Sequence, residues 1–182
     1  WGKYNHSLEY ISINISVNQL RQDNFIQIIL KYLNQYNIPP NMIVLEITEN
    51  VLIGNFEKIS KTVSTLRSKG IRFALDDFGT GYSSLRFLQS LPIDVLKIDR
   101  GFISQDTHND SGKQLLKSVI DIAHNFNLVT VASGLEKQHQ IDFVKLINCD
   151  YVQGYFYSKP IAGDDILQFM NDWQNKKALQ KH

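Results

Sequence analysis

The sequence predicts an α/β fold, namely a (β/α)₈ barrel that is incomplete and contains about six of its eight strand–helix units. Six short apolar runs alternate with six helical patterns, and such alternation indicates a parallel sheet with right-handed crossovers. The runs start 23 to 34 residues apart, which is comparable with the roughly 31 residues per unit of a barrel of about 250 residues. A doubly wound open sheet is the alternative, but the first strand–helix turn, SVNQLRQDN, lacks the glycines typical of that fold.

The predicted strands are runs of β-branched and apolar residues bounded by polar or turn-forming residues. The clearest are MIVLEIT, IRFALD and DVLKID, which are rich in valine, isoleucine and leucine. We predict strands over residues 10–16, 42–48, 71–76, 94–99, 128–133 and 151–157.

The predicted helices carry apolar residues three or four positions apart, as a helix with one buried face requires. Gly70 is suited to end the second helix, and Pro92 stops the third. Residues 104–113 are polar and are expected to form a loop. We predict helices over residues 23–36, 57–69, 81–90, 111–126, 137–147 and 164–177.

Composition excludes several classes of protein. Of the 182 residues, 43% are hydrophobic and 20% charged, which is typical of a globular domain, and the net charge of +1 gives no field for binding a nucleic acid polymer. No apolar run is long enough to span a bilayer, and the opening residues lack the pattern of a signal peptide. A single cysteine, Cys149, provides no disulfide framework. We therefore expect a cytoplasmic domain.

Every predicted strand carries polar residues at or just beyond its carboxyl end. In a parallel barrel these ends meet at one rim, where active sites of such barrels lie. Six such positions on one rim predict a single site. The residues are Asn14, Glu46, Glu49, Asp76, Asp77, Lys97, Asp99, Ser133, Glu136 and Gln153.

The kinds of residue at this rim predict a site for hard divalent cations. Carboxylate and amide oxygens favour Mg²⁺, Mn²⁺ or Ca²⁺ over Zn²⁺, and no cysteine cluster or histidine pair is present. The adjacent Asp76 and Asp77 could serve two ions, a known arrangement for phosphoryl displacement. Taken alone, the aspartate pair is more often a helix N-cap beside a solvated neighbour. Lys97 alone is more often an ion-pair partner of Asp99 or Asp77. The whole set on one rim favours the metal site.

Six stretches of the chain resemble the EAL-domain family of bacterial cyclic di-GMP phosphodiesterases. The block DDFGTGYSSL, followed at the family's distance by LKIDR, is the most specific of them. The stretches are INIS (13–16), LEITEN (45–50), ALDDFGTGYSSL (74–85), LPIDVLKIDR (91–100), VASGLE (131–136) and CDYVQGYFYSKP (149–160). The resemblance implies a modified (β/α)₈ barrel that opens cyclic di-GMP to linear pGpG with two Mg²⁺ or Mn²⁺ ions.

The resemblance also implies a role for each matching residue. It makes Asn14, Glu46 and Asp76 ligands of the first metal ion, and places Asp76 and Asp77 around the second. Lys97 corresponds to the lysine that orients or activates the attacking water. The remaining matches are Asp77 and Glu136 among the catalytic residues, Gln153 and Asp99 near substrate and water, and Glu49, Phe78 and Gly79 as anchors of the loop that follows the aspartate pair.

Partners follow from the same resemblance. The loop from Phe78 to Ser84 is associated in this family with dimerisation, so we expect cyclic di-GMP as ligand and a homodimer near the DDFGTGYSS loop. We expect the parent protein to carry an upstream sensory or GGDEF-like domain, through which it could be tethered to a membrane.

Two departures from the family pattern bear on activity. The Glu-Ala-Leu motif is absent, so we expect residues 1–182 to be the C-terminal part of an EAL domain that lacks roughly 60–80 upstream residues. In addition, Ser133 occupies the position of the first glutamate in the family's Glu-Gly-Val-Glu motif, and serine cannot replace a carboxylate ligand or base.

These departures leave alternative functions open. The favoured prediction is an EAL-family domain in which this chain is non-catalytic. One alternative is a degenerate receptor for cyclic di-GMP or a protein-interaction module, and another is an active phosphodiesterase in the intact parent. A metal-dependent lyase or aldolase on the same barrel is the least favoured, because the DDFGTGYSSL block argues against it.

Overall fold

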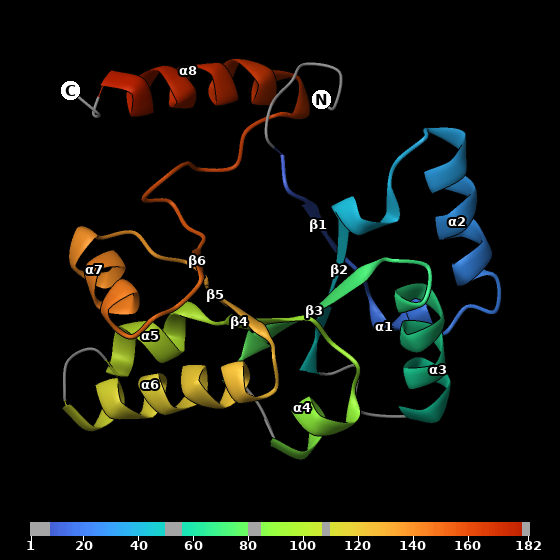
Figure 1. Cartoon of the computed structure of the whole chain (residues 1–182), viewed down its shortest axis with the longest axis horizontal. Helices are drawn as coiled ribbons and strands as arrows, with labels where there is room; N and C mark the ends of the chain where they lie inside the picture. Colours follow the sequence, from blue (N-terminus) through green and yellow to red (C-terminus); the bar gives the residue numbers. More distant parts are fainter. Residues whose placement is uncertain (1–7, 50–55, 80–84, 107–109, 180–182) are drawn as a thin grey trace.

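The predicted barrel architecture is confirmed. The computed structural model describes residues 8–49, 56–79, 85–106 and 110–179. Six parallel strands form one curled sheet in which spatial order equals chain order (Figure 1). Chain-order pairing of parallel strands requires each crossover to pass over the same face of the sheet, and repeated crossovers on one face curl it into a partial barrel. The strands are β1 (Ile11–Asn14), β2 (Ile43–Thr48), β3 (Arg72–Phe78), β4 (Val95–Ile98), β5 (Val129–Ala132) and β6 (Tyr151–Val152).

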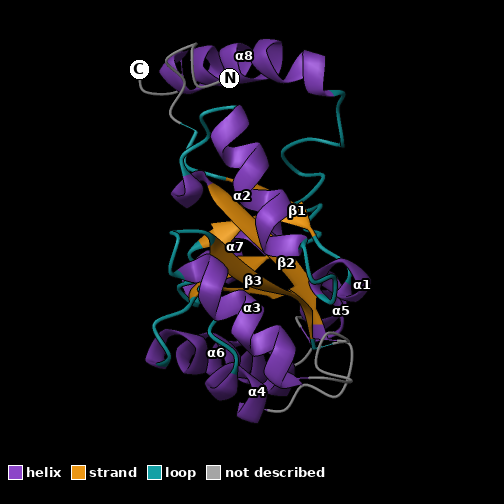
Figure 2. Ribbon diagram, turned by 90° about the vertical axis from the view of Figure 1, so that its right-hand side faces the viewer, coloured by secondary structure: helices purple, strands orange, loops and turns teal. Residues whose placement is uncertain are grey.

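Helices follow every strand. They are α1 (Val17–Leu20), α2 (Phe25–Gln35), α3 (Phe56–Arg67), α4 (Leu85–Ser90), α5 (Arg100–Asp106), α6 (Asp110–Asn125), α7 (Gln138–Leu146) and α8 (Ile166–Leu179), with short 3₁₀ turns η2 (Pro40–Met42) and η4 (Gly163–Asp165). The helices from α2 to α7 surround the sheet, whereas α8 lies apart from them in both views (Figures 1 and 2). Among the described residues, no helix is long and apolar enough to cross a membrane.

The two faces of the sheet have different compositions because side chains alternate along each strand. The outer face carries the larger apolar residues, such as Leu45, Phe73 and Leu96, which pack under the helices in the main core cluster. A second cluster around Ile98 lies beneath α5, α6 and α7. The inner face carries a row of smaller residues, Val44, Ala74, Val95 and Val131, all of them buried.

The polar loop predicted over 104–113 is wrong at both ends. Helix α5 starts directly after β4, and α6 already begins at Asp110; residues 107–109 lie outside the described part. The side chain of Asp99 explains the early start, because its Oδ1 accepts a hydrogen bond from the N–H of Gly101 at 2.7 Å, as an N-cap residue does. The sequence Asp99-Arg100-Gly101, directly after β4, is the signal from which the start of α5 could have been predicted.

The predicted sixth strand, 151–157, is also too long, since β6 ends at Val152. The chain turns at Gly154, where the N–H of Tyr157 donates to the Gly154 carbonyl at 3.1 Å. A Cβ on Gly154 would lie 2.1 Å from the carbonyl oxygen of Leu135, so only glycine allows this close approach of two backbones. For the third helix, 81–84 lie outside the described residues, and α4 covers the remainder.

Two aspartates join neighbouring strands at the opposite, amino-terminal end of the sheet. Asp94 precedes β4 and accepts from the backbone N–H of Phe73 at 2.9 Å and from the guanidinium of Arg67. Asp150 precedes β6 and accepts from the backbone N–H and the hydroxyl of Thr130, both at 2.8 Å. Its Oδ2 also lies 2.9 Å from Nε2 of His124. Both carboxylates therefore stabilise strand pairing rather than line the predicted site.

Candidate active site

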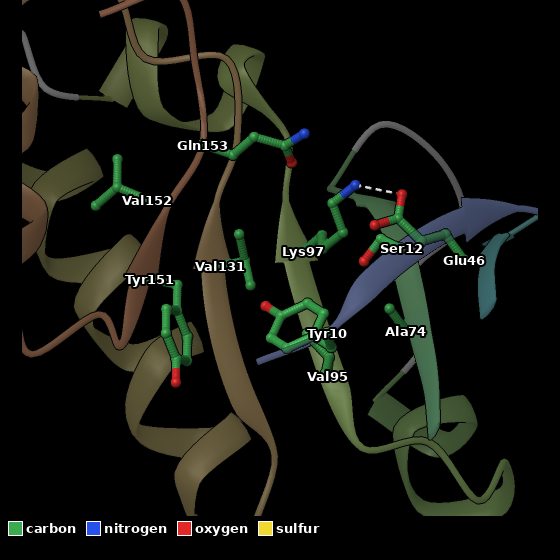
Figure 3. A pocket seen from close by; sticks show the side chains of 10 residues that line it. All are labelled: Tyr10, Ser12, Glu46, Ala74, Val95, Lys97, Val131, Tyr151, Val152 and Gln153. Carbon is green, nitrogen blue, oxygen red and sulfur yellow. Dashed lines mark hydrogen bonds and ion pairs between the residues drawn. The ribbon is translucent and has the colours of Figure 1, made fainter. Parts of the chain in front are cut away.

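The centre of the site is a buried lysine bonded to two carboxylates. Lys97 lies on the inner face of β4, and its Nζ is 2.5 Å from Oε2 of Glu46 on β2 (Figure 3). The same Nζ is 3.0 Å from Oδ2 of Asp76 on β3. The exposed side-chain fractions are only 8% for Lys97 and 7% for Glu46. Charges so deeply buried need partners, and here three strands supply them to each other.

A cavity of about 250 Å³ opens beside this lysine. Figure 3 shows Lys97 and Glu46 on one side of it, with Gln153 extending over it from the end of β6. Tyr10 and Tyr151 face each other across it with ring centroids 6.4 Å apart in an edge-on arrangement. The lining residues are Tyr10, Ser12, Glu46, Ala74, Val95, Lys97, Val131, Tyr151, Val152 and Gln153. The cavity thus has an apolar floor and a charged wall.

A bulge in β3 explains how two neighbouring aspartates reach the same rim. Leu75 pairs with Leu96, but Phe78 rather than Asp77 pairs with Ile98, so β3 contains one extra residue opposite Lys97. Asp77 adopts a left-handed backbone with φ of 57°, and its N–H donates to Oδ1 of Asp76 at 3.0 Å. Phe78 consequently points outward into the main core. A regular strand would have sent Asp76 and Asp77 to opposite faces.

The charges and burial in the site shift the pKa values of Asp77 and Lys97. Burial, followed by the charges of Asp76 and Asp99, raises the pKa of Asp77 above its ordinary value, and the opposing charge of Lys97 does not cancel these effects. For Lys97, burial alone would lower the pKa, but the hydrogen bond to Glu46 and the charge of Asp76 outweigh it and raise the pKa. Lys97 is therefore held as an ammonium at neutral pH.

Three of the other predicted residues lie near this centre. Asn14 pairs in register with Glu46 and shares the inner face by alternation, although β1 leaves it exposed. Oε1 of Glu49 lies 3.4 Å from the N–H of Gly79, the first residue after β3. Asp99 caps α5, as described, and is close enough to raise the pKa of Asp77. Residues 80–84 of the predicted dimerisation loop lie outside the described part.

Neither Ser133 nor Glu136, the two predicted residues after β5, lines this cavity. Glu136 is exposed just before α7, where its N–H donates to Oε1 of Gln140, and it does not line the cavity. Ser133 turns its hydroxyl to the backbone, donating to the carbonyl of Ile98 at 2.9 Å. Position 133 therefore contributes to this rim a hydroxyl that is bonded to the backbone, and no negative charge.

The residues predicted from the sequence do not include the two aromatic side chains that line the cavity, Tyr10 and Tyr151. Tyr10 directly precedes β1, and Tyr151 is the first residue of β6; these are the two edge strands. The guanidinium of Arg72 lies 4.7 Å from the centroid of the Tyr10 ring. The hydroxyl of Tyr151 donates to Oε2 of Glu9 at 3.1 Å. The signal in the sequence is the alternation of inner-face residues, which runs from Ser12 back to Tyr10 near the amino-terminal end of β1.

The donor set fits a hard divalent cation in its chemistry. Glu46, Asp76 and the nearby Asp77 outnumber the single lysine, so the site has a surplus of negative charge. In the described part of the chain, no three acidic, histidine or cysteine side chains converge as a complete metal centre. Mg²⁺ is usually bound by one or two carboxylates together with water and substrate phosphate oxygens, so two carboxylates here are sufficient.

Comparisons with known proteins agree with this geometry. The family model described as "EAL domain" matches residues 3–160. The signaling protein YkoW of Bacillus subtilis is 36% identical over 160 residues, which cover 88% of this chain and 20% of YkoW. The chain spans about a fifth to a quarter of the length of the first curated relatives it matches.

Solved structures resemble the chain closely. The crystal structure of the EAL domain of Mycobacterium smegmatis DcpA has a TM-score of 0.84 at 35% identity, and the match covers 90% of this chain and 73% of that one. The PaMucR phosphodiesterase in complex with c-di-GMP has a TM-score of 0.84 at 29% identity, covering 91% and 67%. The Klebsiella pneumoniae BlrP1 complex with manganese and cy-diGMP has a TM-score of 0.78 at 25% identity, covering 85% and 40%. This chain belongs to the EAL domain family.

Proposed function

We propose that the chain forms the C-terminal part of an EAL domain that binds cyclic di-GMP, and that by itself it does not hydrolyse this dinucleotide. The observation that carries the proposal is the buried Lys97 held between Glu46 and Asp76 at the carboxyl ends of β2, β3 and β4. PaMucR, whose structure matches this chain with a TM-score of 0.84, was solved with c-di-GMP. The reaction of the family, which an active parent protein would carry out, is metal-dependent hydrolysis of cyclic di-GMP to pGpG.

We assign the divalent ions, Mg²⁺ or Mn²⁺, to Glu46, Asp76 and Asp77, with Asn14 as a further oxygen donor on the neighbouring strand. Manganese is present in the BlrP1 complex. When bound, such ions supply Lewis-acid stabilisation of phosphate charge and a water of lowered pKa.

The protein's own residues determine the rest of the chemistry. Because Lys97 is held as an ammonium, it donates hydrogen bonds to a phosphate oxygen or to a water, and it orients that water rather than acting as its base. The side chain of Asp77 is accessible to solvent, but its partial burial and the charges of Asp76 and Asp99 raise its pKa. A carboxylate with a raised pKa is more basic, so Asp77 is the better acceptor for a proton from the attacking water. In an active parent, the water oxygen would add to phosphorus while Asp77 accepts the water's proton. The P–O3′ bond would break, the departing 3′ oxygen would take up a proton from solvent, and Asp77 would release its proton to solvent.

Ser133 carries the non-catalytic part of the proposal. The serine hydroxyl is committed to the carbonyl of Ile98 and offers no negative charge to a metal or a water. Losing several kcal/mol of charge stabilisation slows a reaction by orders of magnitude, since each ~1.4 kcal/mol is about tenfold. Glu136, which lies outside the cavity, does not replace that charge. If the intact parent protein also binds cyclic di-GMP without hydrolysing it, the parent is a degenerate receptor, which is the second candidate function.

Two further proposals concern partners. The curated relatives are four to five times as long as this chain's match to them, so we propose that the parent carries a sensory or GGDEF-like domain upstream. We also propose a homodimer near the segment that begins with Asp76, Asp77 and Gly79.

The test combines binding and turnover. The chain is titrated with cyclic di-GMP in the presence of Mn²⁺ by calorimetry, and pGpG is followed by chromatography in wild type and in Ser133→Glu. Binding without pGpG in wild type is expected. The absence of any binding would overturn the ligand assignment, whereas steady formation of pGpG by wild type would overturn the non-catalytic assignment. A longer form that includes the upstream sequence, with and without Ser133→Glu, then separates truncation from the serine as the cause.

A further inference from the structure

The left-handed conformation of Asp77 needs support from the surrounding structure. A residue other than glycine rarely has positive φ, and aspartate is among the few that tolerate it. Asp77 has φ of 57° and is followed after one residue by Gly79 with φ of 102°. The hydrogen bond from the N–H of Asp77 to Oδ1 of Asp76 joins two adjacent residues. A bond between neighbours does not by itself fix the direction in which the chain leaves β3. The buried side chain of Phe78 holds the segment on one side of Gly79, and contacts from beyond the strand can hold Gly79 itself.

Phe102 on the first turn of α5 is placed to do this. A Cβ built on Gly79 would lie 2.4 Å from Cδ2 and 3.2 Å from Cγ of Phe102, so the ring takes the space that a side chain at position 79 would need. The ring is itself partly buried against the cluster around Ile98 and Ile103. Its backbone is fixed because its N–H donates to the carbonyl of Asp99 at 3.1 Å.

The Gly79 peptide also contacts the end of β2. Oε1 of Glu49 accepts from the N–H of Gly79 at 3.4 Å, while the ring of Phe102 covers its Cα. Gly79 therefore lies between a carboxylate that follows β2 and a ring from α5. This contact joins the strand that supplies Glu46 to the helix that follows Lys97.

We infer that Phe102 is a positioning residue: its ring holds Gly79 and thereby keeps Asp77 in the left-handed conformation of the β3 bulge, next to Asp76 and opposite Lys97. The contact geometry stands by itself, and its consequence for metal binding rests on the proposed function. Supporting residues of this kind affect metal affinity by about 10–100-fold when they are replaced.

The experiment compares Phe102→Ala with Phe143→Ala in the full chain. Phe143 is a matched control because it is a partly buried phenylalanine packed against the same cluster but on α7. The three atoms nearest to a Cβ built on Gly79 all belong to Phe102. Two measurements are made on each variant: the ¹H–¹⁵N and ¹³Cα chemical shifts of Asp77 and Gly79, and the affinity for Mn²⁺ by calorimetry. Thermal unfolding records the general loss of stability.

Phe102→Ala is expected to shift the Asp77 and Gly79 signals and to weaken Mn²⁺ binding by about tenfold or more. Phe143→Ala is expected to lower the melting temperature by a similar amount without either effect, and Phe102→Leu to restore part of the loss. If the Asp77 and Gly79 shifts respond equally to both alanine variants, the inference is wrong. Wild type that binds no Mn²⁺ would refute the proposed metal site, while the chemical shifts would still decide the role of Phe102. Should Phe102→Ala not fold, Phe102→Leu against Phe143→Leu makes the same comparison.

Discussion

Replacing Lys97 with methionine removes the only cation that contacts Glu46 and Asp76 among the described residues, while keeping a side chain of similar length. The two carboxylates would then be buried together without compensation, since the exposed side-chain fractions are only 7% and 15%. Removing one partner of a buried ion pair costs about 3–5 kcal/mol. For a domain of this size each kcal/mol lowers the melting temperature by about 2–4 °C, so we expect a decrease of roughly 6–20 °C.

The assay is thermal unfolding by circular dichroism at neutral pH, with Lys58→Met as the control. Lys58 also forms an ion pair at 2.6 Å, with Asp23, but both side chains are largely exposed. Exposed pairs contribute about 1 kcal/mol or less. The double variant Lys97→Met with Glu46→Gln should recover part of the lost stability, because it removes one of the stranded charges. If Lys97→Met costs no more than Lys58→Met, the interpretation of Lys97 as the centre of a buried charge network is refuted.

The remaining predictions concern Asp77, Asp150 and Gly79. Burial and neighbouring carboxylates raise the pKa of Asp77, so ionised Asp77 destabilises the fold; Asp77→Asn should raise the melting temperature at pH 7, and this gain should disappear below about pH 4. Burial opposes ionisation of Asp150, but hydrogen bonds from Thr130 and His124 outweigh it and lower the pKa. Wild type should therefore be more stable than Asp150→Asn above about pH 4, and the difference should shrink as the pH falls through the lowered pKa. Denaturant titrations over a series of pH values measure this difference, and a constant difference would contradict the prediction. Gly79→Ala should lower the free energy of unfolding by about 1–3 kcal/mol, because position 79 has positive φ and contacts Phe102. Gly163→Ala, with open space around it, should change this free energy by less than about 0.5 kcal/mol. Equal effects of the two substitutions in urea unfolding would refute the contact.

Sequence alone determined the order of the strands and the identity of most rim residues. Alternation between apolar runs and helical patterns predicts a parallel α/β sheet, because a parallel connection needs a crossover of that length. The period of two within LEIT and VLKI places Glu46 and Lys97 on the face opposite to their large apolar neighbours. These features are local, so they can be read from a short window of sequence. The same window also contained the signal for α5 in the residues after Asp99.

Only the tertiary structure decided how the rim residues meet. The bulge at Asp76 and Asp77 depends on pairing with Lys97, a residue 21 positions away from Asp76, and no local pattern in DDFG reveals it. Ser133 could have faced the cavity, but its hydroxyl bonds to the carbonyl of Ile98 on the neighbouring strand. The ring of Phe102 against Gly79 likewise joins two segments through packing. Register, burial and charge pairing are properties of distant segments brought together, and for that reason they are settled by the fold rather than by any single stretch of the chain.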